Sequence, residues 1–178
     1  PTYVARGQKL PITLLAGRLV ALNPGASCDY QRSPTASYAA LEIELQHQGL
    51  TPILVGAPSD ADACEAVLSN LPGPVMNLCG QTSVAEMAFV LERCELLISN
   101  DTGAVHLASA VGTRCIGIYG ASAWFRETAP WGTGHLVVQA PLDADLSIVS
   151  VNDLISVIAA VLNLSAPAAP ISDGVTVW

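Results

Sequence analysis

Short apolar runs alternate with longer segments of helical spacing along most of the chain. The short runs have the length of strands and are apolar at nearly every position, which is typical of parallel strands covered on both faces. We expect strands at Arg18–Asn23, Pro52–Gly56, Val75–Leu78, Leu96–Ser99, Cys115–Tyr119 and Leu136–Gln139. We expect helices at Tyr38–Gln48, Ala61–Leu68, Ser83–Arg93, Gly103–Val111 and Val151–Leu162.

This alternation of strands and helices with short connections predicts an α/β fold. The expected architecture is a doubly wound, mainly parallel, six-stranded Rossmann-like sheet formed by residues 18–164. Residues 1–17 show no clear element and are predicted to be a linker or arm, and residues 165–178 a C-terminal extension that docks elsewhere. Because the first residue is Pro1 and not Met, we expect the chain to begin inside a longer gene product.

Composition and charge exclude several classes of protein. Hydrophobic residues make up 51% of the 178 residues and charged residues 12%, which excludes a disordered chain. The longest charge-free stretch, Leu154–Ser172, contains Asn163, Pro167 and Pro170, so no membrane-spanning helix is expected. The net charge is −8 with only seven Lys and Arg residues, so nucleic acid is not an expected partner.

The five cysteines are scattered without C-x-x-C spacing, which argues against a zinc, iron–sulfur or redox motif. We interpret them as free thiols in a reducing cytoplasm. No His, Cys or carboxylate pair has the spacing of metal ligands, so neither a metal nor another cofactor is expected. His47 and His135 have no nearby partners and are interpreted as surface or structural residues.

The strongest candidate site begins where a predicted strand ends at Asn100 and a predicted helix starts at Gly103. Asp101 or Thr102 can cap that helix, whose first amide groups then face the sheet edge where ligands bind and suit a phosphate. His106 lies three residues after Gly103 and is expected to point toward the same mouth. The alternative is an ordinary capped helix with a structural histidine, but the adjoining Asp-Thr-Gly favours a phosphate site.

Two other loops at this edge are weaker candidates. Gly25, Ala26 and Ser27 follow the first predicted strand and let backbone amides approach a ligand, although a simple tight turn fits equally well. Asp60 follows the second predicted strand and can accept hydrogen bonds from ribose hydroxyls, or it can merely cap the next helix.

A third loop, with Ser122 and the following Arg126, could contact a diphosphate, and a solvated loop arginine is the equal alternative. The chain contains no G-x-G-x-x-G, no G-x-x-x-x-G-K-[ST] and no G-x-S-x-G motif. Dinucleotide binding of the usual kind, a P-loop nucleotidase and a serine hydrolase are therefore not supported.

The succession of these motifs resembles the C-terminal, donor-binding half of glycosyltransferase family 9, the ADP-heptose:lipopolysaccharide heptosyltransferases. The resemblance spans about residues 19–135. The matching motifs are, in order, Asn23-Pro24-Gly25-Ala26-Ser27, Gly56-Ala57-Pro58 with Asp60, Gly80-Gln81-Thr82-Ser83-Val84-Ala85-Glu86, Ser99-Asn100-Asp101-Thr102-Gly103-x-x-His106-Leu107-Ala108 and Tyr119-Gly120-Ala121-Ser122. The fourth motif together with the third is more specific than either alone.

The resemblance implies one half of a GT-B enzyme that transfers heptose from ADP-heptose to a lipid-linked, lipopolysaccharide-type acceptor by a metal-independent, inverting reaction. The catalytic base would lie in an N-terminal acceptor domain that this chain lacks, so the chain itself would bind the donor and contribute no catalytic residue. The implied location is cytoplasmic, with the full-length enzyme at the inner face of the bacterial inner membrane as a further option. The residues implied to contact the diphosphate and sugar are Asp101, Thr102, Gly103 and His106, with Thr82 and Ser83 by the base and Asp60 by the ribose.

One stretch departs from the family pattern. After the first loop, family members carry a lysine that meets the phosphates, whereas this chain has Gln31-Arg32-Ser33-Pro34. Arg32 is then the candidate for that phosphate contact. Two further functions stay open: a non-catalytic scaffold or binding module, motivated by the lost lysine, and a sugar-nucleotide epimerase of GT-B fold.

Overall fold

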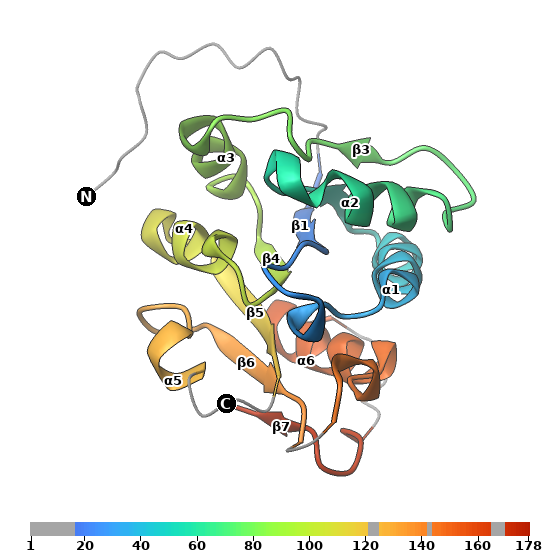
Figure 1. Cartoon of the computed structure of the whole chain (residues 1–178), viewed down its shortest axis with the longest axis vertical. Helices are drawn as coiled ribbons and strands as arrows, with labels where there is room; N and C mark the ends of the chain where they lie inside the picture. Colours follow the sequence, from blue (N-terminus) through green and yellow to red (C-terminus); the bar gives the residue numbers. More distant parts are fainter. Residues whose placement is uncertain (1–16, 121–124, 142–143, 165–169) are drawn as a thin grey trace.

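In the part of the chain that the structure describes, seven strands form one sheet in the order β3-β2-β1-β4-β5-β6-β7 (Figure 1). This computed structural model describes residues 17–120, 125–141, 144–164 and 170–178. All neighbouring strands are parallel except β6 and β7. The strands are β1 (Leu19–Asn23), β2 (Thr51–Leu54), β3 (Met76–Asn77), β4 (Leu96–Asn100), β5 (Arg114–Tyr119), β6 (Leu136–Gln139) and β7 (Thr176–Val177).

Helices cover both faces of the sheet, as expected for a doubly wound fold. The helices α1, α2 and α6 lie on one face, and α3 and α4 lie on the other (Figure 1). They are α1 (Thr35–His47), α2 (Ala61–Leu68), α3 (Val84–Leu91), α4 (Gly103–Val111), the four-residue α5 (Phe125–Thr128) and α6 (Val151–Leu162). Within the described ranges there are also three short 3-10 helices, η1 (Asp29–Gln31), η2 (Pro58–Asp60) and η3 (Leu146–Ile148).

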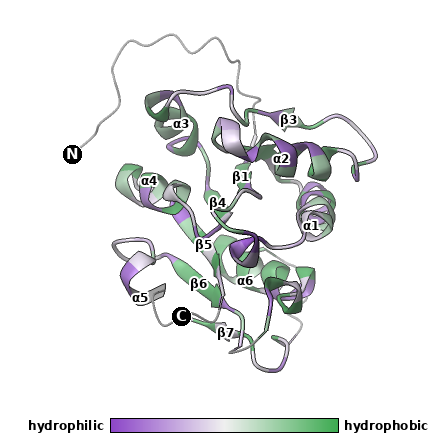
Figure 2. Ribbon diagram, viewed as in Figure 1, coloured by the Kyte–Doolittle hydropathy of each residue, from purple (hydrophilic) through white to green (hydrophobic). Residues whose placement is uncertain are grey.

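The core consists of two apolar layers, one on each side of the sheet, because successive side chains of a strand point to opposite faces. In β1, Val20 and Leu22 pack toward the layer that includes α1 and α6, while Leu19 and Ala21 pack toward α3 and α4. Hydrophobic colour accordingly dominates β6 and the helices α4 and α6 (Figure 2). Among the described residues, no helix is both long and apolar enough to cross a membrane.

The predicted α/β class, the parallel sheet and the five predicted helices are confirmed. The strand count was wrong, because the sheet has seven strands and not six. The missed strand, β7, is too short to give a pattern, and it forms because the tail pairs antiparallel with β6, with Trp178 and Val137 exchanging backbone hydrogen bonds of 3.0 and 3.1 Å. The tail therefore adds to the same sheet. The predicted arm lies outside the described residues except for Gly17.

The chain changes direction between β1 and β4, the two strands at the centre of the sheet. From β1 the chain moves outward to β2 and β3, and from β4 it moves the opposite way to β5 and β6. The loops that follow β1 and β4 consequently separate at the carboxyl edge of the sheet. In open α/β sheets this switch point is where ligands bind.

Candidate functional site

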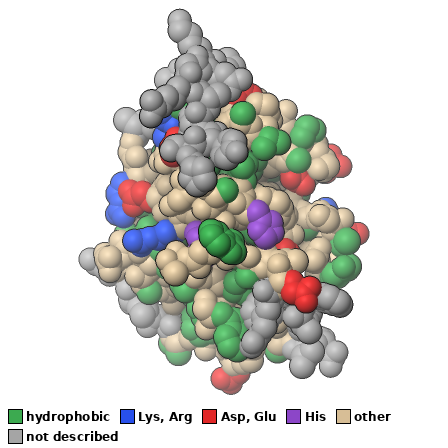
Figure 3. Space-filling model, turned by 90° about the vertical axis from the view of Figure 1, so that its left-hand side faces the viewer, with side chains coloured by type: hydrophobic (Ala, Val, Ile, Leu, Met, Phe, Trp, Pro, Cys, Tyr) green, Lys and Arg blue, Asp and Glu red, His purple; other side chains and the backbone are tan. Residues whose placement is uncertain are grey.

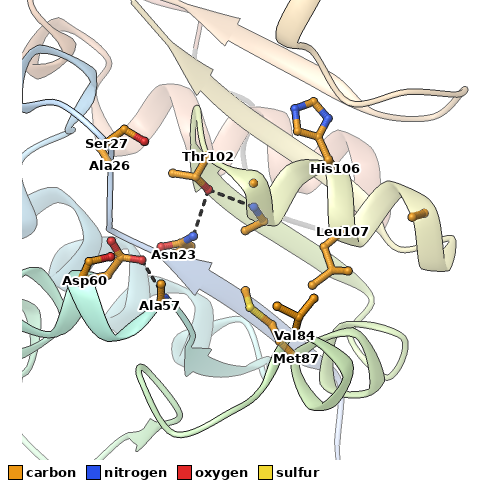
Figure 4. A pocket seen from close by; sticks show the side chains of 14 residues that line it. Asn23, Ala26, Ser27, Ala57, Asp60, Val84, Met87, Thr102, His106 and Leu107 are labelled. Carbon is orange, nitrogen blue, oxygen red and sulfur yellow. Dashed lines mark hydrogen bonds between the residues drawn. The ribbon is translucent and has the colours of Figure 1, made fainter. Parts of the chain in front are cut away.

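A pocket of about 640 Å³ opens at this switch point. Figure 4 shows two kinds of wall. The polar side is formed by side chains from the ends of β1, β2 and β4, namely Asn23, Ser27, Asp60 and Thr102. The apolar side comes from α3 and α4, with Val84, Met87 and Leu107. The pocket therefore offers hydrogen-bonding groups opposite a hydrophobic surface.

The N-terminus of α4 forms part of the pocket wall. Thr102 is the N-cap, and its Oγ1 accepts a hydrogen bond of 3.2 Å from the amide of Ala104. Gly103 lines the pocket, and a Cβ on it would meet no other atom within 4 Å. The first amides of a helix carry partial positive charge and lack helical partners, so a ligand oxygen can approach them here.

The loop after β1 lies directly beside Asp60. The amide of Ala57 donates a hydrogen bond of 2.8 Å to Asp60 Oδ2. A Cβ on Gly25 would collide with the carboxylate of Asp60, so a larger residue at this position would force Asp60 to move. Ala26 and Ser27 line the pocket together with Asp60. The side chain of Asp60 makes no capping hydrogen bond to α2, which leaves one carboxylate oxygen for other partners.

Asp101 lies beside the pocket but does not line it. Its Oδ2 accepts hydrogen bonds from Gln31 Nε2 at 3.3 Å and Thr128 Oγ1 at 3.4 Å. Burial raises the pKa of Asp101, while the Thr128 hydrogen bond and nearby His106 act in the opposite direction. Gln31 therefore contacts this carboxyl group through a neutral amide.

Arg32 supports the first loop and does not line the pocket. Its guanidinium pairs with Asp29 at 3.2 Å and donates to the Ala26 carbonyl at 3.3 Å. Ser122, also predicted from sequence as a contact, lies outside the described residues, as does the side chain of Arg126.

On α3, the structure brings different residues to the pocket than the sequence suggested. Ser83 caps this helix, accepting from the amide of Glu86 at 3.3 Å, and neither Thr82 nor Ser83 lines the pocket. Val84 and Met87, one turn apart, line it in their place. Val84 is 74% exposed, and an apolar residue at the first position of a capped helix was the available signal for this wall.

The pocket is lined by no Lys or Arg among the described residues, and His106 is its basic side chain. On the face shown in Figure 3, the Lys and Arg side chains lie mainly toward the edges of the molecule, and a histidine and a hydrophobic side chain lie near its centre. Within the described ranges, no group of three or more His, Cys, Asp or Glu residues is arranged to hold a metal ion. The backbone amides at the start of α4 are therefore a source of positive partial charge in the pocket.

Comparisons with known proteins agree with this architecture. The sequence model of glycosyltransferase family 9 (heptosyltransferase) matches residues 6–155. Lipooligosaccharide heptosyltransferase 2 of Campylobacter jejuni is 30% identical over 128 residues, which are 68% of this chain and 39% of that protein. The chain thus spans about two fifths of the length of that curated relative.

Two solved structures share the fold. The Escherichia coli ADP-heptose LPS heptosyltransferase II superimposes with a TM-score of 0.75 at 23% identity, over 83% of this chain and 47% of that one. The E. coli heptosyltransferase WaaC with ADP superimposes with a TM-score of 0.68 at 23% identity, over 82% of this chain and 45% of that one. With its family model matched over most of its length, this chain belongs to glycosyltransferase family 9.

Proposed function

We propose that this chain is the donor-binding half of an inverting, metal-independent glycosyltransferase. In this proposal the full-length enzyme transfers heptose from ADP-heptose to a lipopolysaccharide-type acceptor. The observation that carries the proposal is the start of α4, where Gly103 leaves the first helical turn open to the pocket. A diphosphate fits such a site because its oxygens accept hydrogen bonds from the amides and its charge interacts favourably with the helix dipole.

The two walls of the pocket suit the other parts of an ADP-sugar. Asp60 is available to accept hydrogen bonds from ribose hydroxyls. Val84, Met87 and Leu107 provide an apolar surface on which a flat base can pack. One structurally similar protein is described with ADP and another as an ADP-heptose enzyme, which supports an adenine nucleotide over other donors.

Catalysis in this proposal is shared with a second domain of the full-length enzyme. The acceptor hydroxyl attacks the anomeric carbon from the face opposite the diphosphate, and a base on the other domain takes its proton. The bond from the anomeric carbon to the diphosphate oxygen breaks, so negative charge develops on that oxygen. The amides at the start of α4 are fixed in advance to stabilise this charge, with His106 at the pocket rim beside them.

Calorimetric titration of the chain with ADP-heptose, ADP, UDP and GDP tests the proposal. We expect ADP and ADP-heptose to bind and the other two nucleotides to bind much more weakly. Gly103→Ala should weaken ADP binding about tenfold or more, because the new methyl group occupies ligand space without disturbing the protein. Gly73→Ala is the matched control, because its Cβ also meets nothing within 4 Å and Gly73 does not line the pocket. Absence of binding for every nucleotide would overturn the proposal.

A second candidate is a non-catalytic binding module, favoured by the neutral Gln31 in contact with Asp101. Such a module would bind the nucleotide with reduced affinity and support no transfer. Assaying the full-length protein for release of ADP in the presence of donor and acceptor separates the two functions. Donor binding without transfer would establish the second candidate.

A further inference from the structure

Two asparagines end the two central strands, and each reaches the loop that follows the other strand. Asn23 closes β1 and Asn100 closes β4, with exposures of 2% and 0%. Asn23 Nδ2 donates a hydrogen bond of 3.1 Å to Thr102 Oγ1, at the start of α4 (Figure 4). Asn100 Nδ2 donates in the reverse direction, to the carbonyls of Pro24 and Gly25, both at 3.0 Å.

The amide of Asn100 has no capacity left for a ligand. Its two N–H protons are donated to the carbonyls in the loop after β1. Its Oδ1 accepts from the amide and hydroxyl of Ser33, at 3.2 and 2.7 Å. An amide side chain has two donors and an acceptor with two lone pairs, so all four positions are used.

The same accounting applies to the hydroxyl of Thr102. Ser99 Oγ donates to the carbonyl of Asn100 at 2.7 Å, which uses the proton of Ser99. In the 3.0 Å contact between the two hydroxyls, Thr102 is therefore the donor and Ser99 the acceptor. Thr102 Oγ1 also accepts from Asn23 and from the amide of Ala104. One proton and two lone pairs are the full capacity of a hydroxyl, so Thr102 is saturated within the protein.

We propose that Asn23, Asn100 and Thr102 form a strand-end clasp of positioning residues that holds the loop after β1 and the start of α4 as one unit. In this clasp the hydroxyl of Thr102 fixes Asn23 and caps α4, while the ligand oxygens are met by the backbone amides that follow it. The family resemblance implied that Thr102 contacts the diphosphate and sugar, and this assignment gives its side chain a positioning role within the protein. It rests on the proposed function only for the identity of the ligand.

The first test compares Thr102→Ser, which keeps the hydroxyl, with Thr102→Val, which removes it at similar size. Gly25 lies in the other loop, and its amide donates to Asn23 Oδ1 at 3.0 Å. In the ligand-free chain, we expect the Gly25 amide to exchange with solvent about tenfold faster in Thr102→Val and near the wild-type rate in Thr102→Ser. ADP affinity should follow the same order. Weaker ADP binding in Thr102→Val with unchanged Gly25 exchange would contradict the proposal, because the hydroxyl would then act on the ligand.

The second test replaces the donor of the clasp with a carboxyl group through Asn100→Asp. At pH 7.5 the new carboxylate would face two carbonyl oxygens, so we expect ADP affinity to fall about tenfold or more. A protonated carboxyl can donate one hydrogen bond, and burial raises the pKa of such a group. We expect the Gly25 amide of Asn100→Asp to exchange faster than that of the wild type at pH 7.5. At pH 5.5 the exchange rate of the variant should return toward that of the wild type at the same pH. The wild-type reference at each pH corrects for the other ionisable groups around the pocket, Asp60, Asp101 and His106.

Asn77→Asp is the matched control for the second test. Asn77 also ends a strand, β3, but its Oδ1 only accepts from the amide of Cys79 at 2.9 Å, a role that aspartate keeps. We expect Asn77→Asp to leave Gly25 exchange and ADP affinity near wild type at both pH values. Equal effects of the two aspartates, or an Asn100→Asp effect independent of pH, would overturn the clasp. If Asn100→Asp does not fold, the Thr102 pair decides the question alone.

The two readouts separate this inference from the proposed function. Should the wild-type chain fail to bind ADP, the proposed function falls, while Gly25 exchange in the ligand-free variants still tests the clasp. Should the wild type bind ADP and the variants show wild-type exchange and affinity, the clasp falls and the donor site stands.

Discussion

Two regions of this chain hold loops in place through buried polar side chains, and the two regions use different chemistry. The strand-end clasp beside the pocket consists of neutral amides and hydroxyls. At the start of α6, the carboxylate of Asp153, 1% exposed, accepts hydrogen bonds from the backbone and hydroxyl of Ser150 at 2.8 and 2.7 Å. It also accepts one of 2.7 Å from the amide of Ser172, which attaches the C-terminal segment.

The comparison indicates that a buried carboxylate suits a position away from the pocket, such as Asp153, and that a neutral amide suits a position beside it, such as Asn100. Hydrogen bonds to a charged group are stronger than neutral ones, so Asp153 can fix a distant segment with one side chain. A second carboxylate at Asn100 would add negative charge next to the proposed diphosphate site. The neutral clasp gives up strength per bond and avoids repelling the ligand. The hold of the clasp on its two loops should also be independent of pH, whereas the hold of Asp153 on the C-terminal segment depends on pH.

Removing the charged anchor should give the largest loss of stability. Asp153→Ala leaves the amides of Ser150 and Ser172 without their acceptor, at a cost of about 2–4 kcal/mol in the free energy of unfolding. Chemical denaturation measures this loss. The control is Asp145→Ala, because Asp145 caps only the short η3 and its bond to Ser147 is exposed. Similar losses in both variants would show that the contact with Ser172 contributes little.

Crowding the loop after β1, which the neutral clasp holds, should have an intermediate effect on stability. Gly25→Ala places a methyl group against the Asp60 carboxylate, and we expect a loss of about 1–3 kcal/mol together with weaker ADP binding. In Gly103→Ala the stability should stay at the wild-type level or rise slightly, because the added Cβ meets no atom and favours the helix. Denaturation of the two variants side by side provides the measurement. An unchanged stability of Gly25→Ala would mean that Asp60 moves away freely.

The pH dependence of stability sharpens the contrast further. Burial favours the neutral form of Asp153, but hydrogen bonds from Ser172 and Ser150 outweigh it and hold the pKa of this carboxyl below its usual value. Its stabilisation is therefore complete above the unfolded pKa of about 3.9 and is lost as the pH falls through the lower folded value.

We therefore expect the stability difference between wild type and Asp153→Asn to be constant from pH 7 to 5 and to shrink below about pH 4. Denaturation at a series of pH values measures it. A difference that already shrinks between pH 7 and 5 would contradict the lowered pKa of Asp153.

The smallest expected effect concerns the departure at Gln31. Gln31→Lys puts an ammonium group beside Asp101, near the start of α4. We expect ADP affinity to rise about threefold, the size of a partly solvated ion interaction. The control Gln48→Lys makes the same change of charge beside Glu44, away from the pocket. An equal rise in both variants would assign the effect to net charge alone.

Local sequence patterns predicted the elements and the strand–helix junction well, because both depend on short-range periodicity and capping. The start of α4 at Gly103 and the cap at Thr102 are examples. The strand-end clasp could not be predicted from local patterns, because Asn23 and Thr102 are 79 positions apart in the sequence and Asn100 and Pro24 are 76 apart. Only the adjacency of β1 and β4 brings these side chains together.

The apolar side of the pocket was missed for a related reason. Val84 and Met87 look like ordinary residues of an amphipathic helix until α3 is placed beside α4, where both helices line the pocket. The Thr-Ser dipeptide before α3 drew attention to polar contacts, but Ser83 is used as a helix cap. Similarly, β7 depends on pairing with a distant strand, and its two residues carry no periodic signal of their own.

The central claim is that ADP binds at the switch point with its phosphates at the start of α4. An NMR titration of the ¹⁵N-labelled chain with ADP tests it most directly. We predict saturable shifts of the amides of Gly25, Ser27, Gly103, Ala104 and Val105, with the amides of β7 unaffected. The absence of saturable shifts, or shifts confined to residues outside the loop after β1 and the start of α4, would contradict the account.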